Sequence, residues 1–231
     1  VTDTETDEPV EILTDETGDL TVQVFKTIVD PFVGRISFLK VRSGVLTTDT
    51  QVYNPKKDKM EKINQIFIIK GKHQTAVGKL FTGDIGAVTK LQYTQTNDTL
   101  CEKGKHYVVD DITFSEPMLG VAVWPKTKND DDKLTNALAR MVEEDPTTRL
   151  VNNPETKENV LYCVGDQHID VIVNKMKAKY KVEVNLTTPK IPYRETIKKT
   201  VIGEGRHKKQ SGGHGQFGHV FVEFSPNPDV E

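Results

Sequence analysis

Short runs of alternating apolar and polar residues follow one another between residues 20 and 114. Each run holds β-branched, aliphatic or aromatic residues, and the five clearest are 21–29, 35–41, 51–53, 62–69 and 85–91. Turn-forming pairs such as Asp30-Pro31, Ser43-Gly44 and Asn54-Pro55 separate them. Many short strands at this spacing, without a helical stretch, predict a β-barrel over residues 20–114.

A different pattern begins after residue 115, where strand-like and helical periods alternate. Two sets of apolar residues recur every three or four positions: Leu134, Ala137, Leu138, Met141 and Val142 in the first, and Ile169, Ile172, Val173, Met176 and Tyr180 in the second. Each set forms one face of an amphipathic helix. We expect Asn129 and Asp166 to cap these helices, and Pro146 to end the first one.

Strand-like stretches surround the two helices, at 119–124, 148–151, 159–164 and 182–186. The resulting order β-α-β-β-α-β predicts a ferredoxin-like split sandwich over residues 115–189, with two helices on one face of a four-stranded sheet. At the start of the second helix we expect His168 to pack or cap rather than to bind a metal. The predicted fold class is therefore multidomain, with a β-barrel followed by an α+β sandwich.

The two ends of the chain have a different character. Residues 1–19 contain eight of the 34 acidic residues and none of the 31 Lys and Arg residues, and we expect a flexible acidic lead-in. Residues 190–231 contain a strand-like stretch near 193–200 and another that ends at Phe224. Because two or three isolated strands are marginally stable in water, this segment predicts the truncated start of a third, β-rich domain.

The composition is that of a soluble protein, with 35% hydrophobic and 28% charged residues. No apolar run approaches the roughly 18 residues of a membrane span, and no signal-peptide leader opens the chain. We therefore expect a cytoplasmic protein without membrane contact. Cys101 and Cys163 fall in different predicted domains and have no CxxC neighbour, so we expect buried, reduced thiols.

The charge of the chain changes sign once the acidic lead-in is set aside. The whole chain has a net charge of −3, whereas residues 20–231 carry +5. Between Lys190 and His219 there are seven basic residues and two acidic ones. A mildly basic body with a basic C-terminal segment suits contact with phosphate backbones, although solvated protein faces have similar compositions.

One glycine-rich stretch, residues 213–218, matches the pattern Gly-x-Gly-x-x-Gly. A dinucleotide site needs a strand before these glycines and a helix after them, so that the helix N-terminus can receive the pyrophosphate. Here the glycines are followed by a strand-like stretch, 219–224, and then by turn residues. The stretch therefore needs another explanation than nucleotide binding.

Three further patterns fail as ligand or catalytic sites. Residues 71–80 resemble a P-loop but hold six residues between the glycines, and Leu80 stands where Mg²⁺ needs a hydroxyl. Residues 174–177, Asn-Lys-Met-Lys, end in Lys where a guanine-specificity motif needs a carboxylate. Three histidines match no zinc spacing and have lysines among them: His207, His214 and His219. We expect no catalytic residue, cofactor or metal in this chain.

Several short phrases resemble bacterial elongation factor G, the ribosomal translocase. In the predicted barrel these phrases are 25–26, 30–35, 43–46, 83–85 and 98–101, and in the predicted sandwich they are 125–127, 144–147 and 165–173. Two more follow near the C-terminus, Tyr-Arg-Glu-Thr-Ile at 193–197 and the glycine-rich 210–220. Because they occur in the family's order, residues 22–225 resemble its second domain, its third domain and the start of its fourth.

The chain departs from the family pattern at three positions. Thr148 stands where the family usually has Phe, Gln167 replaces a usual Leu, and His214 replaces the commoner Arg between the glycines. These changes suggest a divergent paralogue of the family.

The resemblance implies a non-catalytic piece of a ribosome-dependent GTPase. The family's GTPase domain, which holds GTP and Mg²⁺, would precede Val1 and would be a partner of this chain. In the family the barrel docks on small-subunit ribosomal RNA. The sandwich relays the nucleotide state and touches a small-subunit ribosomal protein, and the fourth domain reaches into the decoding site with its tRNA and mRNA.

Basic residues in two segments are the expected contacts with RNA or the ribosome. They are Arg35, Lys40 and Arg42 in the barrel, and Arg206, Lys208, Lys209 and His214 around the glycines. We interpret 206–219 as a turn between strands, in which glycines let the backbone approach another surface closely. Charges that guard a strand edge, or solvated lysines beside a tight turn, explain the same residues equally well.

Two other function classes stay open. A ribosomal protection factor or another regulatory GTPase would share these domains, and the tip loops of the fourth domain would separate it from a translocase. An acylphosphatase-type enzyme also uses a ferredoxin-like sandwich. That enzyme needs an Arg and a glycine-built phosphate cradle after its first strand, and residues 124–128, Trp-Pro-Lys-Thr-Lys, provide neither.

Overall fold

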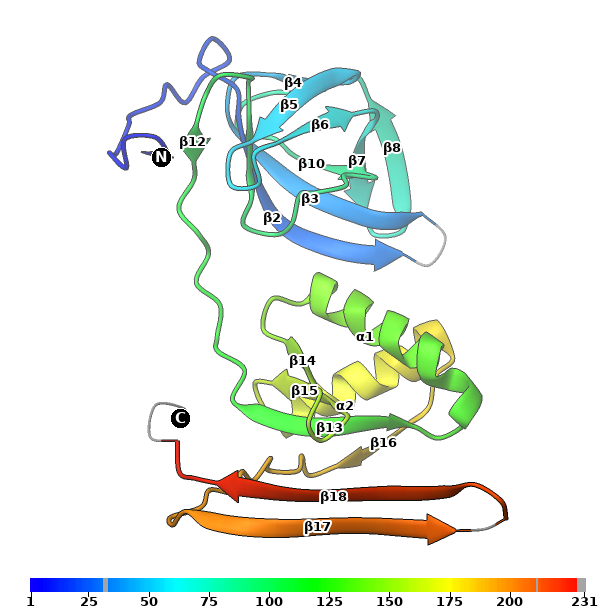
Figure 1. Ribbon diagram of the computed structural model, residues 1–231. Helices are drawn as coiled ribbons and strands as arrows, with labels where there is room; N and C mark the ends of the chain where they lie inside the picture. Colours follow the sequence, from blue (N-terminus) through cyan, green and yellow to red (C-terminus); the bar gives the residue numbers. More distant parts are fainter. Residues whose placement is uncertain (31–32, 211, 228–231) are drawn as a thin grey trace. The chain divides into compact units, whose positions relative to one another are not determined.

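A computed structural model describes residues 1–30, 33–210 and 212–227, without the side chain of Lys128 (Figure 1). Pro31, Phe32 and Ser211, which belong to the family-like phrases, therefore lie outside the described residues. The chain divides into two compact units, Val1–Pro189 and Lys190–Glu231. The first unit contains a rolled β-sheet and a helix-covered sheet, and the second contains a β-hairpin.

An eight-stranded antiparallel sheet forms the first half of the first unit. Its strands are β2 (Thr21–Asp30), β3 (Gly34–Ser43), β5 (Thr50–Asn54), β6 (Lys59–Ile63), β7 (Ile66–Lys70), β8 (His73–Val77), β10 (Ile85–Thr89) and β11 (Thr99–Cys101). They follow the order β6-β5-β11-β2-β3-β10-β7-β8. Two short strands, β4 (Leu46–Thr47) and β9 (Lys79–Leu80), pair beside this sheet.

The predicted strands of this sheet are confirmed, except that one predicted strand is two strands and that the sheet has two strands that we did not predict. The run predicted over 62–69 is two strands, β6 and β7, with Asn64 and Gln65 between them. Sequence reasoning missed β8, whose side chains are almost all exposed, and β11, whose three residues are all buried. Neither strand alternates between apolar and polar residues. Both faces of β8 are in contact with solvent, and both faces of β11 are buried.

A core of aliphatic side chains fills the rolled sheet. Val22, Leu39, Val41, Ile63 and Leu100 are fully buried within it. Burying one such side chain contributes roughly 1.5–3 kcal/mol relative to leaving it in water, and this contribution holds the short strands together.

The second half of the first unit is a four-stranded antiparallel sheet with two helices on one face (Figure 1). The strands are β13 (Leu119–Pro125), β14 (Arg149–Asn153), β15 (Glu158–Cys163) and β16 (Val184–Thr187), in the order β14-β15-β13-β16. The helices are α1 (Asp131–Glu144) and α2 (Asp166–Lys175). This arrangement confirms the split sandwich, and side chains such as Leu138, Leu161 and Ile172 form its core.

The helix ends differ in detail from the prediction. Residues 128–130 form a 3-10 turn, so the N-cap of α1 is Asp130 rather than Asn129. The N-cap of α2 is Gly165, and Asp166 is the first helical residue. Beyond Lys175 the chain continues as one π-helical turn, Met176–Tyr180. Lys181 ends this turn in the left-handed conformation, with φ at 58°.

The acidic N-terminal segment, which we expected to be flexible, makes contacts with the rolled sheet and with the segment around β12. Strand β1 (Thr2–Asp3) pairs with β12 (Tyr107–Val108). The backbone carbonyl of Asp15 accepts a hydrogen bond from the Gly44 N–H at 2.8 Å. The ammonium of Lys105 lies 2.8 Å from a carboxylate oxygen of Asp19. Strand pairing and charge attraction therefore attach this segment where composition alone indicated no structure.

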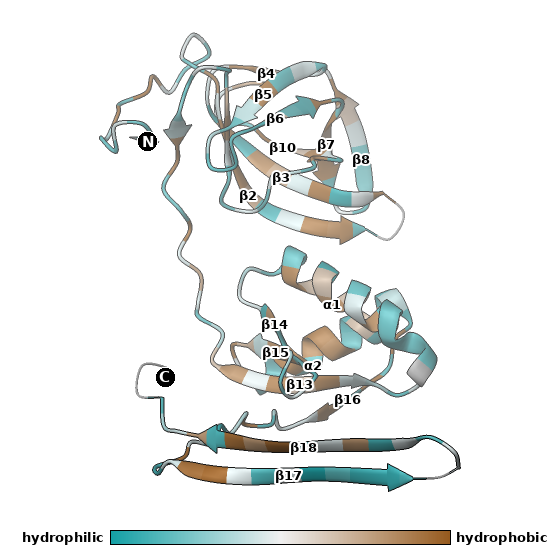
Figure 2. Cartoon of the chain, in the orientation of Figure 1, coloured by the Kyte–Doolittle hydropathy of each residue, from teal (hydrophilic) through white to brown (hydrophobic). Residues whose placement is uncertain are grey.

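The second unit is a two-stranded antiparallel hairpin of β17 (Val201–Gln210) and β18 (Gly215–Phe224). Residues 193–200, where we expected a strand, form none. The turn is also shorter than the predicted 206–219, since most of those residues lie in the two strands. Gly212 has φ at +84°, a left-handed conformation that favours glycine. Figure 2 shows that β17 is hydrophilic along most of its length, whereas β18 becomes hydrophobic toward its C-terminal half.

Candidate functional site

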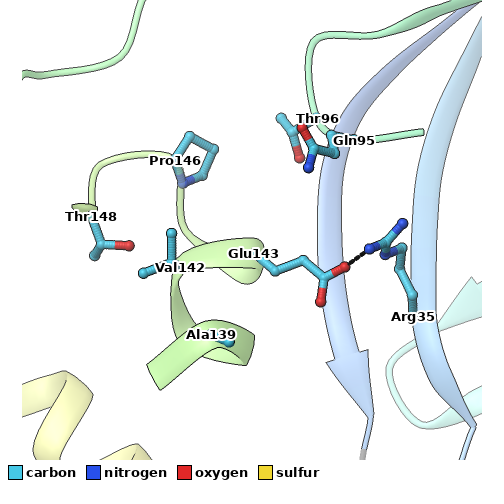
Figure 3. A pocket seen from close by; sticks show the side chains of 8 residues that line it. All are labelled: Arg35, Gln95, Thr96, Ala139, Val142, Glu143, Pro146 and Thr148. Carbon is cyan, nitrogen blue, oxygen red and sulfur yellow. Dashed lines mark ion pairs between the residues drawn. The ribbon is translucent and has the colours of Figure 1, made fainter. Parts of the chain in front are cut away.

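Arg35 joins the rolled sheet to helix α1. One guanidinium nitrogen donates hydrogen bonds to the carbonyls of Leu91, Gln92 and Thr94, at 3.2, 3.2 and 3.3 Å. The other terminal nitrogen forms an ion pair with Glu143 of α1 (Figure 3). Only 21% of the Arg35 side chain is exposed. Arg35 is therefore used inside the chain and is not the exposed strand-edge cation that we expected.

The loop that Arg35 holds is also held from its other side by Glu61. The Glu61 carboxylate accepts hydrogen bonds from the N–H groups of Gln92, Tyr93 and Thr94 at 3.1, 2.7 and 2.9 Å. It accepts a fourth from the Thr94 hydroxyl at 2.9 Å, and Glu61 itself is buried. Arg35 thus binds carbonyls and Glu61 binds amides of one short segment, which satisfies polar groups that would otherwise be costly to bury.

A cavity of about 520 Å³ lies beside this contact. Its walls come from the loop (Gln95 and Thr96), from Arg35, and from the end of α1 and the turn after it: Ala139, Val142, Glu143, Pro146 and Thr148 (Figure 3). The Thr148 hydroxyl donates a 2.7 Å hydrogen bond to the carbonyl of Asp145. Burial and the nearby Arg140 lower the pKa of the Arg35 guanidinium from its ordinary value, while Glu61 acts in the opposite direction.

The other two basic residues predicted on β3 lie on its opposite face. Side chains alternate along a strand, so Lys40 and Arg42 point away from the face that carries Arg35, Leu39 and Val41. The Arg42 guanidinium donates two hydrogen bonds to the side-chain oxygen of Gln23, at 3.1 and 2.5 Å. Lys40 is half-buried. The structure therefore does not bring the three predicted residues into one patch.

The basic residues of the hairpin are exposed, and the strand register sorts them onto two faces. Arg206 pairs with His219 and Lys208 pairs with Phe217, so all four side chains share one face. Lys209 pairs with Gln216 and belongs to the other face. His214 lies in the turn, directly before β18.

Three aromatic residues accompany Arg206 and Lys208, and sequence reasoning did not include them in the site. The rings of Phe217 and His219 are 6.5 Å apart, and those of His219 and Phe221 are 4.9 Å apart. The His219 ring also contacts Glu204, with 2.8 Å between His219 Nε2 and the carboxylate. The sequence does contain a signal for them, because aromatic residues at every second position of a strand lie on the same face. We call Arg206, Lys208, Phe217, His219 and Phe221 the basic–aromatic face.

This face has the chemistry of a nucleic-acid contact. Phe217 and Phe221 are 67% and 66% exposed, which is unusual for phenylalanine. Exposed rings can stack on bases, while Arg and Lys side chains beside them attract phosphates.

Other groups considered from the sequence have structural surroundings. His168 Nε2 lies 3.0 Å from a carboxylate oxygen of Asp145, and the Val164 N–H donates to His168 Nδ1 at 3.4 Å. His168 therefore packs against the segments around Val164 and Asp145, and among the described residues no side-chain hydrogen bond caps the N-terminus of α2. Cys101 and Cys163 are free and buried, and burial raises the pKa of each thiol to about 11. Within the described residues, no group of three or more His, Cys, Asp and Glu side chains forms a metal-binding arrangement.

Comparisons with known proteins account for nearly the whole chain. Residues 19–103 match the family model of elongation factor G domain 2, residues 114–188 match that of domain III, and residues 189–231 match that of domain IV. None of the helices in the described part of the chain is long and apolar enough to cross a membrane.

Individual relatives agree with these models. Elongation factor G of Ureaplasma urealyticum serovar 10 and that of Ureaplasma parvum serovar 3 are each 39% identical to this chain over 221 residues. The alignment covers 96% of this chain and 32% of each relative, so the chain spans about a third of their length. A crystal structure of a Thermus thermophilus protein matches with a TM-score of 0.70 and 31% identity, over 89% of this chain and 31% of that one.

Three consecutive domain models and two relatives lead to the same assignment. The chain belongs to the elongation factor G family of translation factors, and its residues correspond to domains two, three and four of that family.

Proposed function

We propose that this chain is the ribosome-binding and conformational-relay part of an elongation factor G-like GTPase that promotes translocation of tRNA and mRNA. The observation that supports this most is the basic–aromatic face of the hairpin. It places Arg206, Lys208, Phe217, His219 and Phe221 together on an exposed strand pair. That combination suits an RNA with both phosphates and unstacked bases, such as the tRNA and mRNA of a decoding site.

The first unit would add docking and relay. Lys40 and Arg42, on the outer face of β3, are our candidates for contact with small-subunit RNA. Arg35 would instead act in the relay, because it holds the loop 91–96 and Glu143 of α1 at once. A displacement of α1, for example on contact with a small-subunit ribosomal protein, would then move this loop.

We also propose that guanine nucleotide and Mg²⁺ are bound by a part of the protein outside this chain. Two nucleotide-like motifs in the chain support this view. Residues 71–80 form the β8–β9 segment, and residues 174–177 lie at the end of α2, so neither is the loop between a strand and a helix N-terminus that cradles phosphates. Hydrolysis of GTP by this chain alone would overturn this assignment.

Co-sedimentation with ribosomes across a salt series tests the ribosome-binding proposal. We expect the chain to bind at low salt and to dissociate as salt rises, since phosphate contacts release counterions. The variant Arg206→Gln/Lys208→Gln should bind more weakly, with a log–log salt slope smaller by about 2, or about 1 for each phosphate that is no longer neutralised. Ile202→Gln on the same face of β17, farther from the turn, is the matched control. Equal binding of the wild type and the double variant at every salt concentration would contradict the proposal.

A regulatory translational GTPase, such as a ribosomal protection factor, is the second candidate. It is favoured by Thr148, which makes a hydrogen bond where translocases usually carry Phe, and by His214 in the hairpin turn. Single-turnover translocation by the longer protein, with and without Thr148→Phe, separates the two. A translocase should move tRNA before and after the change, whereas a protection factor should not move tRNA in either form.

A further inference from the structure

The segment Asn174-Lys175-Met176-Lys177 has no role in the proposed function, yet it borders a large surface hollow. The hollow measures about 620 Å³ and is lined by Asn174, Lys177, Ala178, Lys181 and Glu183. We call these five residues the lysine hollow. It lies where α2 passes into its π-helical turn, and π-helical turns are frequent at functional sites.

Glu183 organises the charges of the hollow. Its two carboxylate oxygens each lie 2.8 Å from an ammonium nitrogen, one from Lys126 and the other from Lys177. Hydrogen bonds from these two lysines lower the pKa of Glu183 to about 2, so the carboxylate stays ionised at neutral pH. Glu183 therefore holds Lys126, which directly follows β13, beside Lys177 of the π-helical turn.

Positive charge exceeds negative charge around the hollow. Lys177 and Lys181 line the hollow together with the carboxylate of Glu183, Lys126 is paired with Glu183, and Lys175 follows Asn174 in the sequence. All four lysines are exposed. The side chain of Lys177 remains 67% exposed despite its ion pair. Lys179, on the same turn, is different, because it pairs with Glu144 and is only 25% exposed. The helix end contributes a partial charge of about −0.5, which is small beside four ammonium groups.

The geometry points to an extended anion rather than a small enclosed one. A nucleotide or free phosphate is usually held by backbone N–H groups at a helix N-terminus or in a glycine-rich loop. The lysine hollow lies at the opposite helix end, where backbone carbonyls disfavour a buried anion. Exposed ammonium groups on long stems instead suit a row of phosphates outside the hollow.

We propose that the lysine hollow, with Lys126 and Lys175 at its edge, docks on the phosphate backbone of a folded RNA. This contact goes beyond the proposed function, which places RNA on the outer face of β3 and on the hairpin. It gives the sandwich an RNA-binding surface of its own.

Lys181 allows a test that removes charge without disturbing the fold. Its φ of 58° lies in a region that side chains other than Gly, Asn and Asp rarely adopt. Lys181→Asn therefore removes the charge and keeps a residue suited to this backbone. Combined with Lys177→Gln, it removes two of the four positive charges. Lys70→Gln/Lys72→Gln, at the exposed turn between β7 and β8, is the matched control with the same change of charge.

The experiment measures anisotropy of a fluorescein-labelled stem-loop RNA bound to the whole chain, between about 50 and 200 mM salt. We expect Lys177→Gln/Lys181→Asn to reduce the log–log salt slope by about 2, and the control to change it by less than about 0.5. The far-UV circular dichroism of both variants should match that of the wild type. Equal slopes for both variants, or no change in either, would overturn the proposal.

Two further measurements test whether the hollow binds a small anion or a protein instead of RNA. Displacement of the RNA by inorganic phosphate or GTP, at constant ionic strength, would replace the RNA proposal by a small-anion site. Loss of ribosome binding without any change in RNA affinity would replace it by a protein contact. The hairpin variant Arg206→Gln/Lys208→Gln is measured in parallel. The two variants test the two proposals separately, so RNA binding by the hairpin and RNA binding by the lysine hollow can each be contradicted without the other.

Discussion

Arg35 on β3 and Arg206 on β17 are both arginines on antiparallel strands, but their surroundings give them opposite roles. The Arg35 guanidinium is used up by three backbone carbonyls and Glu143, inside a unit with a filled core. Arg206 lies on a hairpin in which every residue of β18 is exposed. An arginine on a strand therefore does not by itself indicate an RNA contact, because the partners that burial provides decide what the charge does.

The same contrast holds for aromatic and apolar side chains. In the first unit most large aliphatic side chains are buried, with exceptions such as Leu13 and Ile85, whereas Phe217, Phe221 and Phe224 of the hairpin are each more than half exposed. A contiguous set of exposed apolar side chains marks an interaction surface. The first unit thus directs most of its apolar side chains into a core, whereas the hairpin exposes its own. Four measurements test this difference.

The largest effect should come from Glu61. Glu61→Gln leaves a neutral amide facing three backbone N–H groups and the Thr94 hydroxyl, so the rolled sheet should lose about 3 kcal/mol of stability. Amide hydrogen exchange of Gln92, Tyr93 and Thr94 should accelerate strongly in the variant. Glu102→Gln, at an exposed position, is the control and should change neither quantity. Unchanged exchange in Glu61→Gln would show that the loop does not depend on this carboxylate.

Arg35→Met should cost less, about 2 kcal/mol. It removes three hydrogen bonds to neutral carbonyls and the ion pair with Glu143, but at a partly exposed site where water can solvate the freed groups. Arg35→Lys should not restore the lost stability. The planar guanidinium can bind the carbonyls and Glu143 at the same time, whereas a compact ammonium group cannot. Urea unfolding followed by exchange in the loop 91–96 measures both. Unchanged stability together with weaker ribosome binding in Arg35→Met would contradict the inward role of Arg35, since Arg35 would then act as an RNA contact.

On the hairpin the expected effect is on binding and not on stability. Phe221→Ala removes one exposed ring from the basic–aromatic face and should weaken binding of single-stranded RNA by about 1–2 kcal/mol. Val222→Ala, one residue away on the opposite face, is the matched control and should leave RNA affinity unchanged. Fluorescence titration with a labelled single-stranded RNA measures the difference. Equal losses in both variants would mean that the two faces are not distinct in RNA binding.

The smallest effect concerns Asp145, an inward charge on the sandwich. Partial burial raises the pKa of this carboxyl, but hydrogen bonds from Thr147 and the nearby His168 outweigh burial and hold the pKa below 3.8. Its contribution, about 1 kcal/mol, should be fully present above pH 3.8 and lost as pH falls through the lowered pKa. The unfolding temperatures of the wild type and Asp145→Asn should therefore approach each other as pH falls from 3.8 through the lowered pKa. A constant difference between them down to low pH would exclude this titration.

Sequence patterns predicted the folds of both domains in the first unit but not its charge network. Runs of β-branched and other apolar residues predicted β2, β3 and β10. The apolar spacing of Leu134 to Val142 predicted α1, because its buried residues lie on one face of the helix. β8 and the N-terminal segment escaped because exposed polar residues carry no such period. Glu61, buried with four hydrogen bonds, had no local signal, since its partners lie more than 30 residues away.

The site residues divide in the same way. Local sequence patterns were enough to assign the family, to place most strands and helices, and to choose Arg206, Lys208, Lys209 and His214 as exposed basic residues, because these patterns depend on near neighbours. Only the tertiary structure decided that Arg35 faces inward, that Phe217 and Phe221 join Arg206, and that Glu183 gathers two lysines. These three features depend on strand register and on contacts between segments far apart in the sequence. The residues adjacent to each position do not determine either one.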